Sequence, residues 1–268
     1  MRLLVTPDMT AGIPAPPSDS APLWRYLTLE KFRSLVDGRE LFFPHLAILD
    51  DRFEGAFPES QPLKIRALNM IGVRDLTSVA QVNLSPQLRQ AWILARKWAL
   101  VSCWHHSVHE SDAMWRLYAA DKRAVAIETT VGCLRAALGA PPPIPEGFFG
   151  STTYEFGTVE YIDYSDGFIP PANLNAQFFR KRLEFRHEQE VRVLIARYPL
   201  GPDRTIRSDI EPSGKGMPCP VELGALVRRV IVAPGADDKY LNAVARSLAQ
   251  VVPSACVERS SLDAAPNY

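Results

Sequence analysis

The sequence has no excess of charge of either sign. Its 268 residues include 30 Lys and Arg and 30 Asp and Glu, which gives a formal net charge of zero at pH 7. A strongly basic chain would attract nucleic acid whatever its base sequence. We therefore predict no general nucleic-acid binding, although one local basic cluster is present, formed by Arg180, Lys181, Arg182 and Arg186.

Long apolar runs are also absent. No stretch approaches the ~18 consecutive apolar residues that a membrane-spanning helix needs. The N-terminus, MRLLVTPDMT, has no apolar core of the kind found in a secretory signal. From the sequence we expect a soluble, cytoplasmic protein that has no membrane partner.

Closely spaced cysteines are missing as well. No two of the four cysteines have the CxxC spacing of a zinc or redox site. We interpret them as small buried residues in a reducing compartment. The sequence therefore predicts no disulfide framework and no cysteine-based metal centre. The four residues are Cys103, Cys133, Cys219 and Cys256.

Prolines and small residues crowd the N-terminal stretch 7–22, PDMTAGIPAPPSDSAP. This composition is typical of an extended arm or linker. The remainder is short enough to form one sheet-centred unit, since such domains reach ~250 residues. We therefore predict a flexible arm over 1–22 and a single domain over 23–268.

Strand and helix patterns are interspersed along that domain without alternating strictly. This arrangement predicts an α+β fold with a mixed, largely antiparallel sheet flanked by helices. Caps at Thr28 and Thr130 and the Ser85-Pro86 pair mark helix starts. The predicted strands are 23–27, 41–43, 99–104, 123–128, 158–164, 191–196, 226–232 and 255–259. The predicted helices are 29–36, much of 60–100, a helix capped by Ser111 or Asp112 that carries Met114, Trp115, Leu117 and Tyr118, 130–138, 178–187 and 237–250.

The densest charge cluster lies between residues 178 and 196. We interpret its first half as an amphipathic helix and its second half as a buried strand. Side chains alternate along a strand, so Glu188, Glu190 and Arg192 are predicted to share one side at the strand entrance. Carboxylates beside an arginine form either an ion-pair network or a site, and the pattern leaves both open.

Several short motifs follow one another between Trp24 and Leu262. In this order they resemble a large bacterial family known only as a domain of unknown function. The sequence departs from the family pattern at Asp50 (Asn in the family), Arg52 (Pro in the family) and Pro234. The motifs are Trp24-Arg25-Tyr26, Leu41-Phe42-Phe43, the loop 50–54, Ser102-Cys103-Trp104, the Met-Trp-x-x-Tyr-Ala helix 114–119, Glu188-Gln189-Glu190-Val191-Arg192, the turn 230–235 and the ending 257–260.

A basic residue on the first strand and a late Glu-x-Glu strand also make the chain similar, more remotely, to ADP-ribosyltransferases. The resemblance implies a transferase that uses NAD as its substrate and passes ADP-ribose to an unknown acceptor. Fold-level analogy of this kind supplies a hypothesis only. In this hypothesis Arg25 contacts NAD, Ser102 or Trp104 supports the ribose, and Tyr26 or Trp115 packs against the nicotinamide, with Tyr118 as a further aromatic residue beside the ring. Glu190 acts on the ribose, Glu188 activates the acceptor, and Arg192 adjusts the properties of these two carboxylates.

Two other functions remain open at this point. One is a non-catalytic module that binds a nucleotide or a partner, in bacterial stress or phage defence. The other is a metal-dependent hydrolase built on the polar loop 105–112, whose histidines and carboxylates are ligand types. The candidate ligands of this 105–112 loop are His105, His106, His109, Glu110 and Asp112.

We interpret Asp51 and Glu54 as members of an exposed acidic turn.

Overall fold

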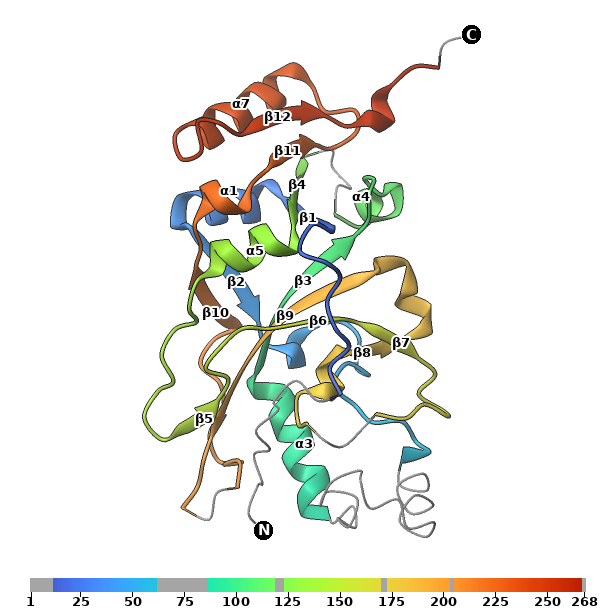
Figure 1. Ribbon diagram of the computed structural model, residues 1–268, viewed down its shortest axis with the longest axis vertical. Helices are drawn as coiled ribbons and strands as arrows, with labels where there is room; N and C mark the ends of the chain where they lie inside the picture. Colours follow the sequence, from blue (N-terminus) through green and yellow to red (C-terminus); the bar gives the residue numbers. More distant parts are fainter. Residues whose placement is uncertain (1–11, 62–85, 119–122, 170–172, 203–204, 267–268) are drawn as a thin grey trace.

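The computed structural model describes residues 12–61, 86–118, 123–169, 173–202 and 205–266 (Figure 1). An eight-stranded sheet runs through these residues in the order β12-β11-β4-β1-β3-β9-β5, and β6 also pairs with β9. Its strands are β1 (Pro22–Thr28), β3 (Ala99–His106), β4 (Ala124–Thr130), β5 (Phe148–Gly150), β6 (Glu155–Thr158), β9 (Glu190–Pro199), β11 (Arg229–Val232) and β12 (Cys256–Arg259).

Neighbouring strands of this sheet are antiparallel, except for the parallel pair β11 and β12. Two small sheets stand beside it. One pairs β2 (Glu40–Pro44) with β10 (Gly216–Pro220), and the other pairs β7 (Glu160–Ile162) with β8 (Arg180–Arg182). The predicted α+β fold with a mixed, largely antiparallel sheet is confirmed.

Helix starts follow the capping signals of the sequence. The Thr28 hydroxyl accepts a hydrogen bond from the Lys31 amide, and the Thr130 hydroxyl accepts one from the Cys133 amide. The helices are α1 (Leu29–Gly38), α3 (Pro86–Trp98), α4 (Asp112–Tyr118), α5 (Val131–Leu138), α6 (Leu223–Leu226) and α7 (Asp238–Ala249), with 3₁₀ turns η1 (Leu46–Ile48), η2 (Ala176–Phe179), η3 (Leu183–Glu188) and η4 (Ser261–Asp263).

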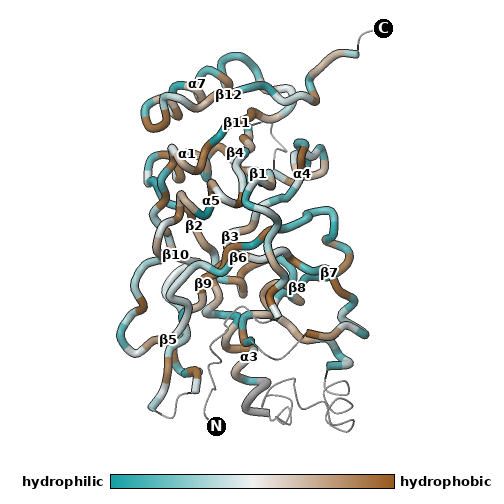
Figure 2. Tube along the Cα trace, viewed as in Figure 1, coloured by the Kyte–Doolittle hydropathy of each residue, from teal (hydrophilic) through white to brown (hydrophobic). Residues whose placement is uncertain are grey.

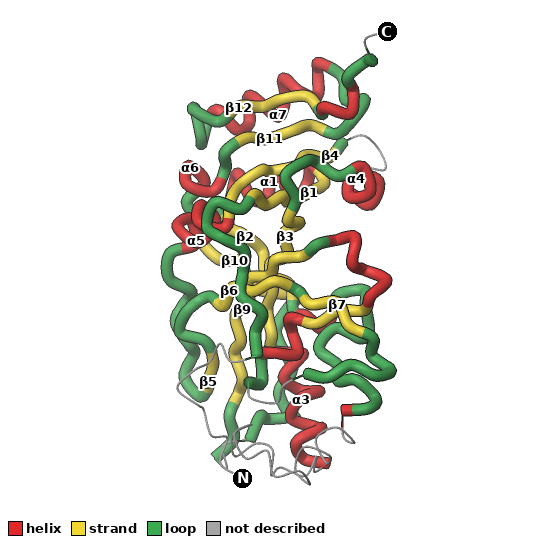
Figure 3. Tube along the Cα trace, turned by 45° about the vertical axis from the view of Figure 1, so that its right-hand side comes forward, coloured by secondary structure: helices red, strands yellow, loops and turns green. Residues whose placement is uncertain are grey.

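Helices cover both faces of the sheet (Figure 3). Leu23 and Leu27 of β1 point to one face, where they share an apolar cluster with α1, α5 and α7. Trp24 and Tyr26 alternate to the other face and pack with α4. A third cluster joins α3 to the far half of β9, and the hydrophobic segments of Figure 2 follow these buried elements.

The sheet opens between β1 and β3. These two strands pair only at Leu23–His106 and Trp24–His105. Beyond that point β1 stays paired with β4, and β3 stays paired with β9. The residues of β1 and β3 that follow therefore face each other across a fork, which leaves an opening inside the sheet.

The predicted helix over 178–187 is wrong. The segment forms η2, then β8, then η3. Phe178, Phe179, Arg180 and Lys181 are all buried, and four consecutive residues cannot share the buried stripe of one α-helix. The two cations also need separate partners, because Arg180 pairs with Glu160 whereas Lys181 pairs with carboxylates of the pocket described below.

Smaller corrections concern segment boundaries. The predicted strand 158–164 is divided into β6 and β7 by buried Val159. The predicted loop 200–219 contains part of β10. The predicted strand 226–232 begins only after α6. The helical prediction for 62–85 lies outside the described residues, as does the cap at Ser85. Among the helices of the described part, none is long and apolar enough to span a membrane.

Residues 12–21 of the predicted arm lie against the domain. The Thr158 amide donates to the Pro14 carbonyl oxygen at 3.1 Å, and the Thr158 hydroxyl donates to that of Ala15 at 2.9 Å. Arg180 donates to the carbonyl oxygen of Gly12 at 3.0 Å. The division of the chain at residue 22 stays a prediction.

We expect Gly150→Ala to destabilise the protein by about 3 kcal/mol, the upper end of what overpacking costs. A Cβ atom at Gly150 would lie 2.0 Å from the carbonyl oxygen of Ala196 on the paired strand β9. Gly38→Ala is the matched control, because its Cβ meets nothing closer than 3.7 Å. Urea unfolding of both variants measures the difference, and equal midpoints would contradict this packing.

Candidate functional site

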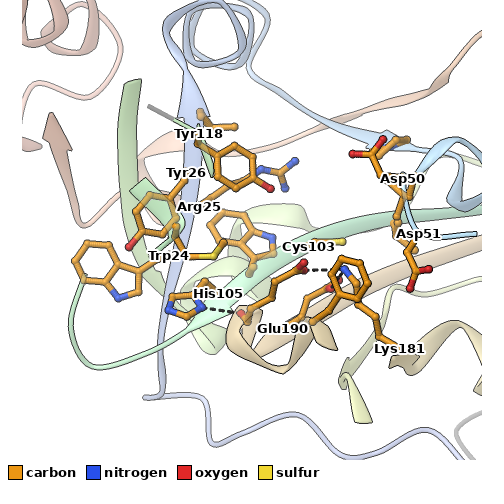
Figure 4. Close-up of a pocket in the computed structure, with 18 of the residues that line it drawn as sticks. Trp24, Arg25, Tyr26, Asp50, Asp51, Cys103, His105, Tyr118, Lys181 and Glu190 are labelled. Carbon is orange, nitrogen blue, oxygen red and sulfur yellow. Dashed lines mark hydrogen bonds and ion pairs between the residues drawn. The ribbon is translucent and has the colours of Figure 1, made fainter. Parts of the chain in front are cut away.

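The fork between β1 and β3 opens into a pocket of about 290 Å³ (Figure 4). Arg25, Trp104 and Glu190, which the sequence analysis assigned to one site, line it together. The strands β1, β3 and β9 supply its floor, α4 one wall, and η3 with the loop 49–54 another. Residues that are far apart in the sequence therefore meet at one cavity.

Arg25 is the cation of the β1 side. Its guanidinium donates to the Ser102 hydroxyl and, at 3.5 Å, to the Phe42 carbonyl oxygen, and it lies 5.3 Å from the Trp104 ring centroid. Trp104 donates its indole N–H to the same Ser102 hydroxyl at 3.0 Å. In the described part of the chain, no carboxylate lies within ion-pair distance of Arg25. Burial lowers the pKa of Arg25, but an arginine stays charged, so the site can accept an anion.

Glu190 is held at the opposite side by a buried ion-pair network. Arg192, which is fully buried, donates to Glu190 Oε1 at 2.7 Å, to Glu54 Oε2 at 2.8 Å and to the Phe178 carbonyl oxygen at 2.5 Å. Lys181 Nζ lies 3.1 Å from Glu54 Oε1 and 3.5 Å from Glu190 Oε2. The carboxylate of Glu190 is thus fixed from two directions.

The second oxygen of Glu190, Oε2, is held less tightly than the first, because its ion-pair partner Lys181 lies at 3.5 Å. Glu190 is 2% exposed, it lines the pocket, and its Oε2 accepts no hydrogen bond from the residues that the structure describes. Burial by itself would raise the pKa of Glu190, but the cations Arg192 and Lys181 hold it below its ordinary value. Glu190 is therefore an ionised acceptor beside the pocket, with the Lys181 ammonium and the Cys103 thiol near it and no close hydrogen bond to Oε2 among the described residues.

Glu188 lies in the same network but not on the strand. It ends η3, and Gln189 with a φ of 40° turns the chain into β9. The prediction that strand alternation places Glu188 and Glu190 on one side is therefore wrong in its reason, because Glu188 precedes the strand, although both residues line the pocket. Glu188 Oε2 accepts from Lys181 Nζ at 2.7 Å, and burial above all raises the pKa of Glu188.

Charge is divided unequally across the pocket. Three carboxylates (Glu54, Glu188 and Glu190) share the two cations Lys181 and Arg192, which leaves one negative charge over on that side. These carboxylates raise the pKa of Lys181 although burial opposes this, so the amine stays charged. The pocket therefore offers an unpaired cation on one side and a surplus anion on the other.

Aromatic rings form the wall on the α4 side. Tyr26 and Tyr118 both line the pocket, with ring centroids 6.4 Å apart and planes inclined by 22°. Trp115 is buried behind Tyr26 at 4.9 Å, edge to face, and its indole N–H donates to Glu110 Oε2 at 2.8 Å. Trp115 thus supports the wall, whereas Tyr26 and Tyr118 present its surface.

Three members of the site, Glu54, Lys181 and His105, were not predicted from the sequence. Glu54 was expected in an exposed turn but is 1% exposed, and its neighbour Asp51 is buried against Arg182 at 3.0 Å. Lys181 was counted only as part of a basic cluster. His105 was placed in a polar loop, whereas β3 carries it into the pocket. The sequence feature that could have indicated a role for Glu54 in the site is its place in the Asp-Arg-Phe-Glu motif.

The histidine-rich segment does not gather into a metal centre. Within the described ranges, no group of three or more His, Cys, Asp or Glu side chains is placed to hold a metal ion. His105 and His106 are consecutive in β3 and point to opposite faces. Glu110 instead accepts hydrogen bonds from Trp115, Ser260 and Ser261.

Comparison with known proteins gives one weak likeness. No protein-family model matches the chain, and the curated proteins contain no match. Solved structures of DarT from Thermus sp. 2.9 align with it, in complex with carba-NAD+ (12% identity, 92% of this chain and 98% of that chain, TM-score 0.38) and with ADP-ribosylated ssDNA (12%, 93%, 97% and 0.38). Likeness at this level identifies no family and no function.

We expect Glu54→Gln to lower the free energy of unfolding by about 3–5 kcal/mol, because it leaves Arg192 and Lys181 with one buried anion fewer. Glu211→Gln is the control, since Glu211 pairs with Lys97 on the surface and such pairs contribute little. Guanidinium titration compares the two variants. A Glu54→Gln midpoint equal to that of Glu211→Gln would contradict the role given to the network.

The stabilisation from Glu190 should depend on pH in one direction. Its pKa in the folded protein lies below the ordinary value of 4.5, so the contribution is complete above pH 4.5 and is lost as the pH falls through the folded-state value. Thermal unfolding of the wild type and of Glu190→Gln should therefore differ most near neutral pH and converge in acid. A difference that grows in acid would refute the assignment.

Proposed function

We propose that this protein is an NAD-dependent ADP-ribosyltransferase that binds NAD+ as its substrate in the fork between β1 and β3. The observation that carries the proposal is the ionised carboxylate of Glu190, whose Oε2 accepts no close hydrogen bond from the described residues, opposite Arg25, a cation without an ion-pair partner among them. A ligand that satisfies both must carry a hydroxyl donor and an anion. A dinucleotide with a pyrophosphate and two riboses has both.

The remaining groups of NAD+ also match the pocket. A guanidinium such as Arg25 binds phosphate oxygens in bidentate fashion. A planar nicotinamide ring fits against the rings of Tyr26 and Tyr118, which lie on the surface of the aromatic wall. A ribose hydroxyl supplies a hydrogen bond to Glu190 Oε2, which accepts none from the described residues. In this assignment Ser102 and Trp104 support the ligand indirectly, by fixing Arg25.

The surplus negative charge suits the chemistry of this substrate. When the bond between C1′ of the ribose and the nicotinamide nitrogen breaks, both electrons leave with nicotinamide, and positive charge develops at the ribose. Fixed carboxylates stabilise such an oxocarbenium-like transition state. A nucleophile of the acceptor then bonds to C1′ and loses its proton. No oxidant or reductant is needed.

The roles follow from these positions. Glu190 orients the ribose and stabilises the developing charge, and Arg192 keeps Glu190 ionised and oriented through Oε1. Glu188, whose pKa is raised, is a candidate to activate the acceptor. The acceptor itself is a macromolecule or water, and the pocket residues favour neither.

A nucleotide-binding module without catalysis is the second candidate. The observation that favours it is that both carboxylate oxygens of Glu54 are held in structural ion pairs, one with Lys181 and one with Arg192. This candidate predicts that NAD+ binds and is not cleaved.

We expect the purified protein to release nicotinamide from NAD+, and Glu190→Gln to reduce that release by roughly 10²–10³-fold, the usual cost of removing one group that stabilises the transition state. Glu211→Gln should keep the wild-type rate, because Glu211 is exposed and pairs with Lys97 outside the pocket. Release is followed by chromatography, with and without cell lysate as a source of acceptors.

Calorimetric titration with NAD+ completes the experiment. Binding by Glu190→Gln shows that the variant is folded and that the loss concerns cleavage. Binding without release by the wild type would exclude the transferase and support the non-catalytic module. If the wild type neither binds NAD+ nor releases nicotinamide, both candidates are excluded.

A further inference from the structure

His105 lines the pocket, yet the roles above leave it unused. It lies directly opposite Glu190 in the β3–β9 pairing and opposite Trp24 in the β1–β3 pairing, at the point where the fork begins. Residues directly opposite each other on antiparallel strands project to the same face. The imidazole and the Glu190 carboxylate are therefore neighbours, and Figure 4 shows them side by side.

The contacts of His105 determine its tautomer. Its Nδ1 lies 2.6 Å from the carbonyl oxygen of Glu188. A carbonyl oxygen only accepts, so Nδ1 carries the proton and donates it. Burial lowers the pKa of His105, and the nearby His106 and His187 lower it further, so the ring is neutral at pH 7. Nε2 is then left with a free lone pair.

The described residues make no hydrogen bond to that nitrogen. Tyr26 of β1 meets the ring edge to face at 6.3 Å, and its hydroxyl accepts a hydrogen bond from the Ser111 amide. From η3 come His187 and the backbone of Glu188, whose carboxylate faces Lys181. From β9 comes Glu190, held by Arg192.

We propose that His105, through Nε2, is the general base that removes the proton from the nucleophile attacking C1′. This inference rests on the proposed function and deepens it. The electrons of the nucleophile's bond to hydrogen form the new bond to C1′, and the proton moves to Nε2. The resulting imidazolium lies beside the surplus negative charge of Glu188 and Glu190, which stabilises it, and it returns its proton to water after release.

Glu188 is the competing base, and its geometry is less favourable. Its Oε2 accepts from the Lys181 ammonium at 2.7 Å, so a proton placed there must compete with a fixed cation. His105 Nε2 has no such cation beside it among the described residues. The backbone of Glu188 instead serves His105, because its carbonyl oxygen fixes the tautomer.

The test compares His105→Asn with His106→Asn and Glu188→Gln. Asparagine at 105 can still donate from Nδ2 to the Glu188 carbonyl oxygen but offers no base toward the pocket. His106 points to the opposite face of β3 and does not line the pocket, so it is a matched control. Nicotinamide release is measured from pH 4.5 to 8.5, NAD+ binding by calorimetry, and rescue with added imidazole.

We expect His105→Asn to keep its NAD+ affinity within about threefold and to lose roughly 10²–10⁴-fold in turnover, the range for a general base. The wild type should lose activity as the pH falls through a value below 6.5, the ordinary value for histidine. That acid limb should disappear in His105→Asn, imidazole should restore part of the rate, and His106→Asn should behave as the wild type.

The outcomes separate this inference from the proposed function. If the wild type releases nicotinamide and His105→Asn keeps both the rate and the acid limb, His105 is not the base. If Glu188→Gln alone removes the limb, the base is Glu188. If the wild type releases no nicotinamide at any pH, the proposed function fails and the role of His105 fails with it.

Discussion

The buried guanidinium of Arg192 is the constraint on which the rest of the site depends. A charge with no exposed surface costs several kcal/mol unless its donors are matched, and leaving it with one partner fewer is costlier than never burying it. Arg192 therefore needs Glu190 on its own strand, Glu54 from a loop 138 residues earlier and the Phe178 carbonyl oxygen of η2 at the same time. Each of these segments must fold inward for β9 to be stable.

This requirement explains the backbone around the pocket. The loop that carries Glu54 cannot stay at the surface, and Gly55 with a φ of 76° lets it pass under Phe178, whose ring would lie 3.2 Å from any added Cβ. Lys181 must reach Glu54, Glu188 and Glu190 together, which a short strand between two 3₁₀ turns allows. The carboxylates of the pocket are thus there because Arg192 and Lys181 need anionic partners. Glu190 Oε2, which accepts no hydrogen bond from the described residues, is the acceptor that these ion pairs leave for a ligand.

Local signals predicted most of the fold. Apolar stretches and caps placed β1, β3, β4, α1 and α5 close to their observed bounds, and strand alternation placed Glu190 and Arg192 on one side, where they pair. Arg25, Trp104 and Glu190 do line one pocket. The burial of Glu54 and Lys181 was not predictable, because their partners are distant in sequence and charged residues ordinarily lie at the surface. The position of His105 depended on where β3 ends, which is the least certain property of a strand read from sequence.

The fork has a mechanical consequence. Each of its two strands is fastened along its outer side, β1 to β4 and β3 to β9, and those partners are themselves packed in the interior. Widening the opening would break ladder hydrogen bonds on both sides, so the slot is stiff across its width. The α4 wall lies outside the sheet and is not held by those ladders, whereas the 49–54 loop is held by the ion pairs of Glu54. The width of the slot is therefore set by the fold before any ligand enters it.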